Sequence, residues 1–481
     1  MQHTSDVRVA TRPDAVVVGS GPNGLAAAIV LARAGRSVVV FEAAGEIGGG
    51  ARSAALTLPG FTHDICSAVH PLARASWVFR EWPLAAHGLE WIEPPASLAH
   101  PFDDGTCALL RGSVDETASG LGSDAHGYRA LVGPLVDAWP RLEADVFGPL
   151  GPTRHPIAMA RFGLRALRSG DGVARGAFGG EEARALFAGC CAHSMLPLDR
   201  PLSAGFGLVL SVLAHVAGWV IPRGGSQQLS NALASYLRSL GGEIVTGARV
   251  ASIDDLPPAR AILCDLSPRP LLQIAAHRFP ARYRRQLESY RHRMAAFKVD
   301  WALDGPIPWR AADCARAATV HVGGTLDEIA RSERDAWDGR IADRPFVLLA
   351  QPSLFDPTRA PAGRHVAWGY CHVPLASAAD MLPRIEAQIE RFAPGFRDRV
   401  VARSVLDPAA LERHNANLVG GDIGGGAVDL GQFFARPTWR TYSTPLRGVY
   451  LCSASTPPGG GVHGFCGYFA AKRALRDVLR D

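Results

Sequence analysis

Three glycines and an acid near the start of the chain have the spacing of a dinucleotide-binding turn. Gly19, Gly21 and Gly24 form a GxGxxG pattern, and Glu42 follows about 20 residues later. Such a turn lets a pyrophosphate approach the backbone at a helix N-terminus, and an acid at this distance is placed to bind a ribose 2′-hydroxyl. Because the acid repels a 2′-phosphate, the pattern favours FAD or NAD over NADP.

The neighbouring residues predict the elements that must position this turn. Ala15–Val18 is a short apolar strand, a helix runs from the turn to about Arg33, and Ser37–Phe41 is a second strand that ends on Glu42. Gly35 suits the C-terminal cap of the helix. A lone GxGxxG is weak evidence, and an ordinary glycine turn is the alternative. The two strands, the helix and the acid together favour the dinucleotide site.

A second glycine loop follows directly. The backbone of Gly48–Gly50 and the guanidinium of Arg52 could hold a pyrophosphate from the side opposite the helix N-terminus. The chain then enters Leu56–Ala68, which is typical of a β-hairpin, where an NAD-dependent dehydrogenase would usually continue with another βα unit. This difference favours FAD.

A third glycine turn lies at the other end of the chain. Gly448–Ala454 is a buried strand, Pro458–Gly464 is rich in glycine, and a helix runs from there to about Leu479. The N-terminus of that helix would stabilise negative charge, such as the charge on the edge of a reduced flavin. Alone this turn is weak evidence for a cofactor site, but together with Gly19–Glu42 it is strong evidence.

Composition bounds the class of protein. The 481 residues suffice for two or three domains, and a formal net charge of +5 is too small to argue for nucleic acid. Nine scattered cysteines indicate a reducing, cytoplasmic location without a disulfide framework. Lys298 and Lys472 are the only lysines, which we interpret as bacterial codon bias. Met1–Pro13 is polar without an export signal and is expected to be a disordered tail.

The middle of the chain has a different texture. Trp77–Arg200 is rich in Pro, His and Trp and indicates an inserted domain. Within it, Ile157–Arg168 predicts a helix with arginines on one face and apolar residues mostly opposite. It is either a membrane-docking helix or a surface helix with a solvated basic face. The apolar run Gly205–Ile221 is short for a membrane span and predicts a buried helix.

Later segments predict a return to the nucleotide domain and then a second domain. Val220–Val250 has the pattern of a turn, a helix and a strand over Glu243–Val250. Pro280–Pro437 alternates strands and helices, such as a strand over Ala296–Leu303 and a helix over Ala379–Phe392, and predicts an antiparallel sheet covered by helices.

Several of these stretches resemble one family. VVVGSGPNGLAAAIVLARAGRSVVVFEA, GGGARS, PGFTHDICSAVHPL, IPRGGSQQLSNAL, HNANLVGGDIGGG and LCSASTPPGGGVHGFCGYFAA are similar to the phytoene desaturase-like branch of the amine oxidase and glutathione reductase-fold flavoproteins. The resemblance implies an α/β fold with a discontinuous Rossmann-like FAD-binding domain of the glutathione reductase type, at 14–76, 215–275 and 438–481. It also implies an inserted α+β substrate domain with an antiparallel sheet, at 77–214 and 276–437.

The resemblance also implies which residues surround FAD. The expected set is Gly19, Gly21, Pro22, Asn23, Gly24, Glu42, Ala43, Gly48, Gly49, Gly50, Arg52, Ser53, Val250, Ser453, Gly460, Gly461 and Val462. Members of the wider superfamily often carry Gly-Asp before the last glycine turn, where this chain has Cys452 and Ser453. A second GxGxxG and a CxxxxC pair are absent from the sequence, which argues against a disulfide reductase with an NAD(P) site.

The sequence offers few side chains for catalysis. His463 lies in the last glycine turn and His63 in the hairpin, so each is a candidate base, with a structural hydrogen bond as the alternative. Cys190, Cys191 and His193 do not converge on one metal ion if they lie on a helix, and no metal site is expected.

We therefore expect an FAD-dependent oxidoreductase, of the dehydrogenase or desaturase kind, that transfers hydride from a hydrophobic small molecule to flavin N5. Oxygen, a quinone or another acceptor would reoxidise the flavin. Two alternatives stay open: an FAD-dependent isomerase without net redox chemistry, and a flavin-bearing binding or scaffold protein without turnover. The expected location is the cytoplasm, and contact between Ile157–Arg168 and the inner face of the membrane stays one of the two alternatives for this helix.

Overall fold

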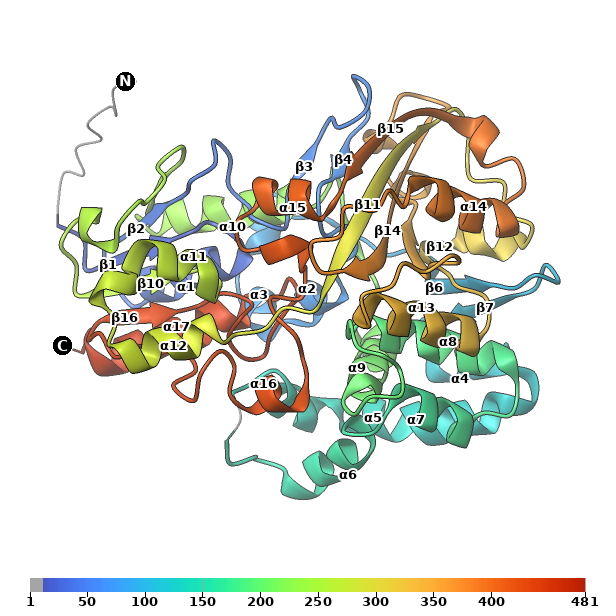
Figure 1. The fold of residues 1–481 in the computed structure, drawn as a ribbon, viewed down its shortest axis with the longest axis horizontal. Helices are drawn as coiled ribbons and strands as arrows, with labels where there is room; N and C mark the ends of the chain where they lie inside the picture. The colour runs from blue at the N-terminus through green and yellow to red at the C-terminus, as the bar shows by residue number, and fades with distance from the viewer. Residues whose placement is uncertain (1–11, 150, 481) are drawn as a thin grey trace.

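A computed structural model of the chain describes residues 12–149 and 151–480, so residues 1–11 of the predicted tail lie outside the described part. The fold is mixed α/β. It contains a parallel Rossmann-like sheet at the left of Figure 1, a larger mixed sheet at the upper right and a group of helices below the larger sheet.

The parallel sheet carries the first glycine turn. Its five strands run in the order β16-β10-β1-β2-β9, and each neighbouring pair is parallel. The strands are β1 (Ala15–Val18), β2 (Val38–Phe41), β9 (Glu243–Val245), β10 (Ala261–Cys264) and β16 (Val449–Leu451). Strand β9 is shorter than the predicted strand over Glu243–Val250. After Val245 the chain leaves the sheet, and the N–H groups of Gly247 and Ala248 donate to the carbonyls of Ala44 and Glu42, which follow β2.

Helices cover both faces of this sheet. On one face α1 (Pro22–Arg33) packs against α10 (Gln227–Ser239) and α17 (Phe465–Asp477). Gly467 permits this contact, since a Cβ there would lie 1.8 Å from the carbonyl oxygen of Asn23. On the other face α11 (Pro268–Ala275) and α12 (Ala281–Glu288) form a separate apolar cluster with β10 and β16.

The larger sheet has seven strands in the order β15-β11-β14-β13-β12-β6-β7. They are β6 (Ala96–Pro101), β7 (Cys107–Leu110), β11 (Met294–Leu303), β12 (Ala317–Val322), β13 (Val347–Ala350), β14 (His365–Pro374) and β15 (Val400–Leu406). All neighbouring pairs are antiparallel except β12 and β6. The sheet is therefore mixed, whereas the sequence predicted an antiparallel sheet. The difference arises at β6, which comes from a distant part of the chain and pairs in parallel with β12.

The two faces of this sheet have different roles. Residues such as Val299, Trp301 and Val347 point to one face and pack with α14 (Leu382–Phe392) in a closed apolar cluster. The alternate residues of the same strands, among them Lys298, point to the opposite face. That face borders a cavity and the helices α8 (Glu181–Ala192), α9 (Ser203–Val216) and α13 (Leu326–Trp337).

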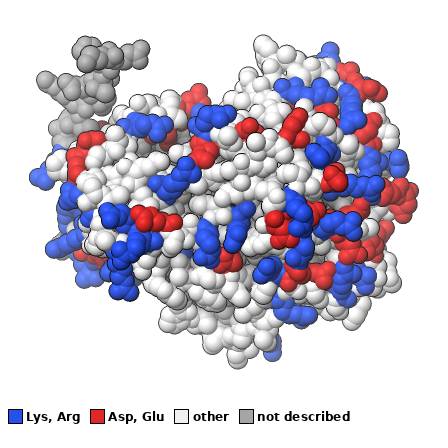
Figure 2. All heavy atoms as spheres, viewed as in Figure 1, with Lys and Arg blue, Asp and Glu red and all other residues white. Residues whose placement is uncertain are grey.

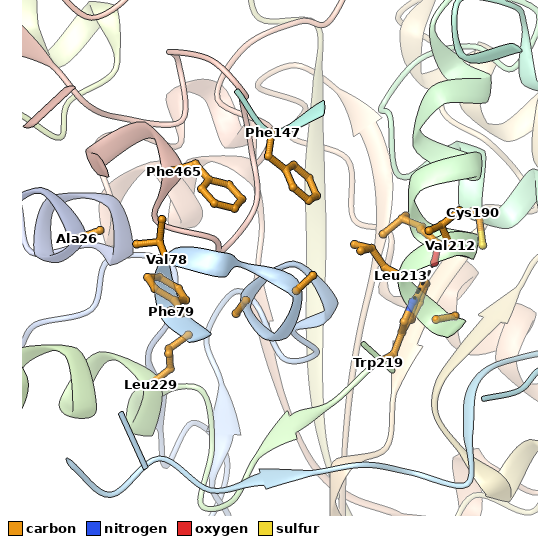
Figure 3. Packing of buried hydrophobic residues seen from close by; sticks show 14 of the residues in the cluster. Ala26, Val78, Phe79, Phe147, Cys190, Val212, Leu213, Trp219, Leu229 and Phe465 are labelled. Atoms are coloured by element: carbon orange, nitrogen blue, oxygen red, sulfur yellow. Dashed lines mark hydrogen bonds between the residues drawn. The ribbon is translucent and has the colours of Figure 1, made fainter. Parts of the chain in front are cut away.

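One apolar core joins the parallel sheet to the helical region. Figure 3 shows Phe79 and Phe465 beside α1, and Leu213 and Trp219 beside Cys190 of α8. Phe465 stacks on Phe147 with 5.1 Å between ring centroids. Helix α9 is buried as predicted, and none of the described helices is both long and apolar enough to cross a membrane.

The helical region also contains α5 (Ala125–Val146), α6 (Pro156–Ala166) and α7 (Gly170–Ala177). The predicted domain boundaries stay a prediction. The strands of the parallel sheet come from the ranges 14–76, 215–275 and 438–481, and those of the larger sheet from 77–214 and 276–437.

Candidate functional site

The first glycine turn connects β1 to α1 with very little space around it. Gly19 has a φ of +101°, and a Cβ on Gly24 would lie 2.0 Å from the carbonyl oxygen of Gly19. Helix α1 begins with Pro22 in its first turn, so its free N–H groups point toward the turn. Gly24 does not line the cavity, but it sets the close packing that brings Gly21 to the cavity wall.

The second glycine loop lies directly against the first. A Cβ on Gly49 would lie 2.9 Å from the Cα of Gly21, so the two backbones are in contact only because neither residue has a side chain. Gly49, Gly50 and Arg52 line the cavity, whereas Gly48 faces away and donates its N–H to the carbonyl of Ser20. The buried Nε of Arg52 has no hydrogen-bond partner in the part of the chain that the structure describes. A guanidinium with a free donor beside two glycine turns fits an anionic pyrophosphate.

Glu42 ends β2 at the edge of the same cavity. One carboxylate oxygen accepts hydrogen bonds from the backbone N–H and the hydroxyl of Ser20, and the other accepts one from Ala44 N–H at 2.8 Å. These bonds fix the orientation of the carboxylate. Each oxygen has further lone pairs, so Glu42 can still accept a ribose hydroxyl. Ala43 and Val250 line the cavity beside it.

Asp265 is a site residue that the sequence analysis missed. It follows β10, lines the cavity, and accepts a hydrogen bond from Gly24 N–H at 3.0 Å. Burial, with a smaller contribution from the neighbouring charge of Glu42, raises the pKa of its carboxyl to about 7, although the hydrogen bond from Gly24 acts to lower it. Ligands bind at the carboxyl ends of parallel strands, so an acid after the strand next to β1 was a usable signal.

The C-terminal glycine turn closes the cavity from a third side. Gly461, Val462 and Ser453 line it. Gly460 does not, because it packs against another backbone segment: a Cβ there would lie 2.7 Å from the carbonyl oxygen of Gly424.

His463 follows that turn but does not reach the cavity. Its Nδ1 accepts a hydrogen bond from Phe465 N–H, so Nε2 carries the proton and donates it to the carbonyl of Gly459 at 3.2 Å. Burial lowers its pKa to about 4. Both nitrogens of this neutral ring are occupied by the backbone, so the geometry favours the structural role over the catalytic one.

His63 and Ser53 also lie outside the cavity. His63 is buried, with Nε2 2.7 Å from the hydroxyl of Thr57, and burial lowers its pKa to about 3. The hydroxyl of Ser53 donates to Asp64, whose other oxygen accepts a 2.6 Å hydrogen bond from Arg359. These residues tie the short hairpin of β3 (Ser53–Ala54) and β4 (His63–Asp64) to the larger sheet. The expectation that Ser53 contacts the cofactor is therefore not supported, because its hydroxyl is used in this anchor.

Lys298 places a charge on the sheet side of the cavity. It lies on β11, is 2 % exposed, lines the cavity, and donates a short hydrogen bond to Asp300 two residues later on the same face. Its Nζ lies 5.8 Å from the centroid of the Trp368 ring. Burial raises the pKa of Asp300 to about 6, although Lys298 acts to lower it. The signal in the sequence was a lysine and an aspartate two residues apart within an apolar strand, in a chain with only two lysines.

One cavity of about 1250 Å³ joins all these walls. It runs from the three glycine turns to the inward face of the larger sheet, where Lys298, Leu348 and Trp368 contribute side chains. The loop 414–418 and the segment 66–72 complete the lining. A cavity with an anion-binding end and a largely apolar end can hold a dinucleotide and a hydrophobic ligand together.

Comparisons with known proteins agree with this geometry. The family profile described as NAD(P)-binding Rossmann-like domain matches residues 17–81. The chain is 27% identical over 547 residues to pyridine nucleotide-disulfide oxidoreductase domain-containing protein 2 of Rattus norvegicus, covering 97% of this chain and 94% of that protein. It is 27% identical over 422 residues to phytoene dehydrogenase of Streptomyces griseus, covering 80% and 77%. A solved structure of a putrescine oxidase variant superimposes with a TM-score of 0.64 at 18% identity, covering 97% and 98%.

These similarities and the geometry of the site support a phytoene desaturase-like FAD oxidoreductase, with FAD as its cofactor. In this flavoprotein the glycine turns, Glu42 and Arg52 are the residues that fit FAD. Within residues 12–149 and 151–480 no group of His, Cys, Asp and Glu side chains is arranged to hold a metal ion. All nine cysteines lie in these ranges as free thiols.

Proposed function

We propose that this flavoprotein is a dehydrogenase or desaturase that removes hydride from a hydrophobic small molecule, with oxygen, a quinone or another acceptor reoxidising the flavin. One observation carries the proposal: the cofactor turns and the sheet wall bound the same cavity. Bound FAD supplies the two-electron acceptor. The names of two relatives, a phytoene dehydrogenase and a 4,4'-diapolycopene oxygenase, support an apolar substrate.

The chain's own residues would bind and orient the cofactor and the substrate, exclude water and relay the proton that the substrate releases. The glycine turns hold the anionic part of the cofactor, and buried apolar walls such as Leu210 and Trp219 exclude water from the substrate side. Lys298 holds a proton at Nζ on the cavity wall, and Asp300 positions it. An ammonium in this position can exchange a proton with a ligand or a water molecule in the cavity.

The test is anaerobic reduction of the FAD-loaded protein. Terpenes, carotenoid precursors and hydrophobic amines are added in turn, and the visible absorbance of oxidised flavin is followed. Bleaching by a hydrophobic compound that has lost two hydrogens supports the proposal. Product formation without consumption of an electron acceptor would instead indicate the isomerase. A flavin that no candidate reduces, together with a protein partner recovered by pull-down, would indicate the scaffold.

We also propose that the protein is a bacterial, cytoplasmic enzyme that touches the inner face of the membrane through α6. Helix α6 differs from the sequence expectation, because Phe162 and Ala166 pack inward while Ile157 and Leu164 are 71% and 75% exposed. Arg161 lies on the same exposed side. Exposed apolar side chains beside an arginine suit an anionic lipid surface.

The surroundings of α6 support this docking. The lower end of the molecule, where α6 lies in Figure 1, carries few charged side chains in the view of Figure 2. Leu167 is 48% exposed just after the helix, and Arg168 beside it is exposed. A solvated basic surface helix, the alternative, would not require the three exposed apolar side chains.

A further inference from the structure

On the sheet wall of the cavity, three residues on neighbouring strands form a row in which two polar side chains flank an alanine. Thr319 on β12 pairs with Ala350 on β13, and Ala350 pairs with Trp368 on β14. All three line the cavity. Because directly paired residues on neighbouring strands point to the same face, the two larger side chains flank a methyl group. Ala350 therefore leaves room between a hydroxyl and an indole.

Both flanking side chains carry a polar atom without a partner. Neither Oγ1 of Thr319 nor Nε1 of Trp368 has a hydrogen-bond partner among residues 12–149 and 151–480. Thr319 is only 6% exposed, so its hydroxyl is screened from bulk solvent. A hydroxyl donates and accepts, and an indole N–H only donates. Each of the two groups can therefore donate a hydrogen bond to an acceptor oxygen of a ligand.

A third polar side chain lies at the same end of the cavity. His193, which caps α8, lines the cavity, and its Nε2 lies 3.0 Å from Nε2 of His321. His321 is two residues after Thr319 on the same face of β12. Burial, together with the smaller effect of nearby His372, lowers the pKa of His193 to about 3. Two neutral rings share one proton in this contact, so Nδ1 of His193 is left as a donor or an acceptor.

The rest of this compartment is apolar or already neutralised. Leu210, Trp219 and Leu348 supply apolar surface. Among the described residues of the sheet that line the cavity, Lys298 carries the positive charge, and Asp300 balances it. A carboxylate or phosphate would therefore lack a free cation, and an ammonium ion would lack a free carboxylate. A pure hydrocarbon would leave the Thr319 and Trp368 donors unpaired, which is unfavourable.

We propose that Thr319, Trp368 and His193 form a recognition site for a neutral oxygen substituent, a hydroxyl or a carbonyl, on an otherwise hydrophobic substrate. The proposal rests on the proposed function in taking this cavity as the substrate chamber. It narrows the substrate class to alcohols and ketones with a large apolar part. It assigns Thr319 as the main specificity residue, because it is the most buried donor of the unpartnered pair.

Binding to the FAD-loaded protein tests the site without requiring turnover. The probes are the straight-chain alkan-1-ols and alkan-2-ones from six to twelve carbons, roughly the range that such a chamber admits, and the alkanes of equal length. Dissociation constants come from calorimetry and from the shift in flavin absorbance. Thr319→Val removes the hydroxyl at constant shape, Trp368→Phe removes the N–H, and Thr319→Ser keeps the hydroxyl as the matched control.

We expect Thr319→Val to weaken alcohol and ketone binding roughly 5- to 30-fold, with alkane binding unchanged or tighter. Trp368→Phe should have a smaller effect of the same sign, and Thr319→Ser should bind like the wild type. Equal losses for alkanes and alcohols would overturn the proposal. So would wild-type alcohol binding in Thr319→Val, as expected if the hydroxyl pairs only with an ordered water molecule, and so would failure of every alcohol and ketone to bind.

The outcome is separable from the proposed function. A protein that selects alcohols through Thr319 but whose flavin is reduced by no bound compound retains the recognition site and loses the dehydrogenase assignment. A protein whose flavin is reduced only by hydrocarbons, with Thr319→Val unaffected, retains the dehydrogenase assignment and loses the recognition site.

Discussion

The carboxylate of Asp265 accepts a hydrogen bond from the amide of Gly24, with 3.0 Å between Oδ2 and N. This contact joins the end of β10 to the first turn of α1, directly behind the first glycine turn. It therefore places a buried acid next to the position of an anionic pyrophosphate. Burial raises the pKa of this acid from its ordinary value of 3.8 to about 7.

Asp265→Asn should change how the stability of the FAD-free protein depends on pH. The folded protein keeps the carboxyl proton up to about pH 7, whereas the unfolded chain releases it near pH 3.8. The wild type therefore loses stability as pH rises through this window, by up to roughly 4 kcal/mol. Urea unfolding at several pH values should show a flatter profile in Asp265→Asn. The exposed Asp380→Asn is the control, and an equally steep profile in Asp265→Asn would contradict the assignment.

Gly24→Ala should damage the cofactor site by moving the backbone. A Cβ there would lie 2.0 Å from the carbonyl oxygen of Gly19, so α1 or the turn must shift. We expect a loss of about 1–3 kcal/mol in unfolding free energy and weak or absent FAD binding. Gly163→Ala in α6 is the matched control, since a Cβ there meets nothing within 4 Å. It should stabilise the protein by about 0.5–1 kcal/mol.

Glu42→Gln should weaken FAD binding. Ser20 and Ala44 orient the carboxylate by donating backbone N–H groups to its two oxygens. In Glu42→Gln one oxygen becomes an NH₂ group, which faces one of these N–H donors and can no longer accept from it. Losing a hydrogen bond to a charged group corresponds to an increase of roughly 10- to 100-fold in the FAD dissociation constant. Fluorescence titration of the FAD-free protein measures it. The exposed Glu243→Gln on the neighbouring strand should leave the constant unchanged; a loss there of similar size would indicate a general charge effect.

Substitutions on α6 should reduce membrane binding without affecting FAD. Ile157→Ser with Leu164→Ser removes two exposed apolar side chains, each more than two thirds exposed, from the proposed docking surface. We expect at least roughly a tenfold loss in binding to anionic phospholipid vesicles, because burying each side chain stabilises by about 1.5–3 kcal/mol. Val401→Ser with Val405→Ser, on exposed β15, is the control. Equal vesicle binding by all three proteins would rule out docking through α6.

The sequence was informative where function depends on the backbone. Three local patterns contain glycines that a close approach of the backbone requires: GxGxxG, GGGARS and PGGGV. The strands, helices and turns that fit FAD could therefore be predicted closely. Gly460 needed the structure, because it packs against the distant backbone of Gly424 without lining the cavity. The order of the larger sheet was also inaccessible, since β6 pairs with β12 across more than two hundred residues.

The substrate wall could not be predicted for a related reason. Thr319, Ala350 and Trp368 come from three strands and are ordinary strand residues in the sequence. Only the register of the sheet brings them into one row. The sequence instead indicated two single histidines as candidate bases. Both ring nitrogens of His463 bond to the backbone, and Nδ1 of His63 lies 3.6 Å from the buried carboxylate of Asp300, outside the cavity.

The pair of Lys298 and Asp300 gives the last prediction, which separates a role in the reaction from a role in folding. Lys298→Met keeps the length of the side chain and removes the charge. It leaves Asp300 buried without its cation, so the pKa of Asp300 should rise above its present value of about 6. The protein should lose about 3–5 kcal/mol of stability at neutral pH and recover part of this loss in mildly acidic buffer.

The double variant Lys298→Met with Asp300→Asn resolves the two roles. It buries no unpaired charge, so its stability should return most of the way to that of the wild type. If Lys298 only supports the fold, flavin reduction should recover along with stability. If Lys298 helps to move the proton that the substrate releases, the double variant should fold, bind FAD and remain slow in flavin reduction. A double variant that is both stable and as fast as the wild type would remove Lys298 from the mechanism.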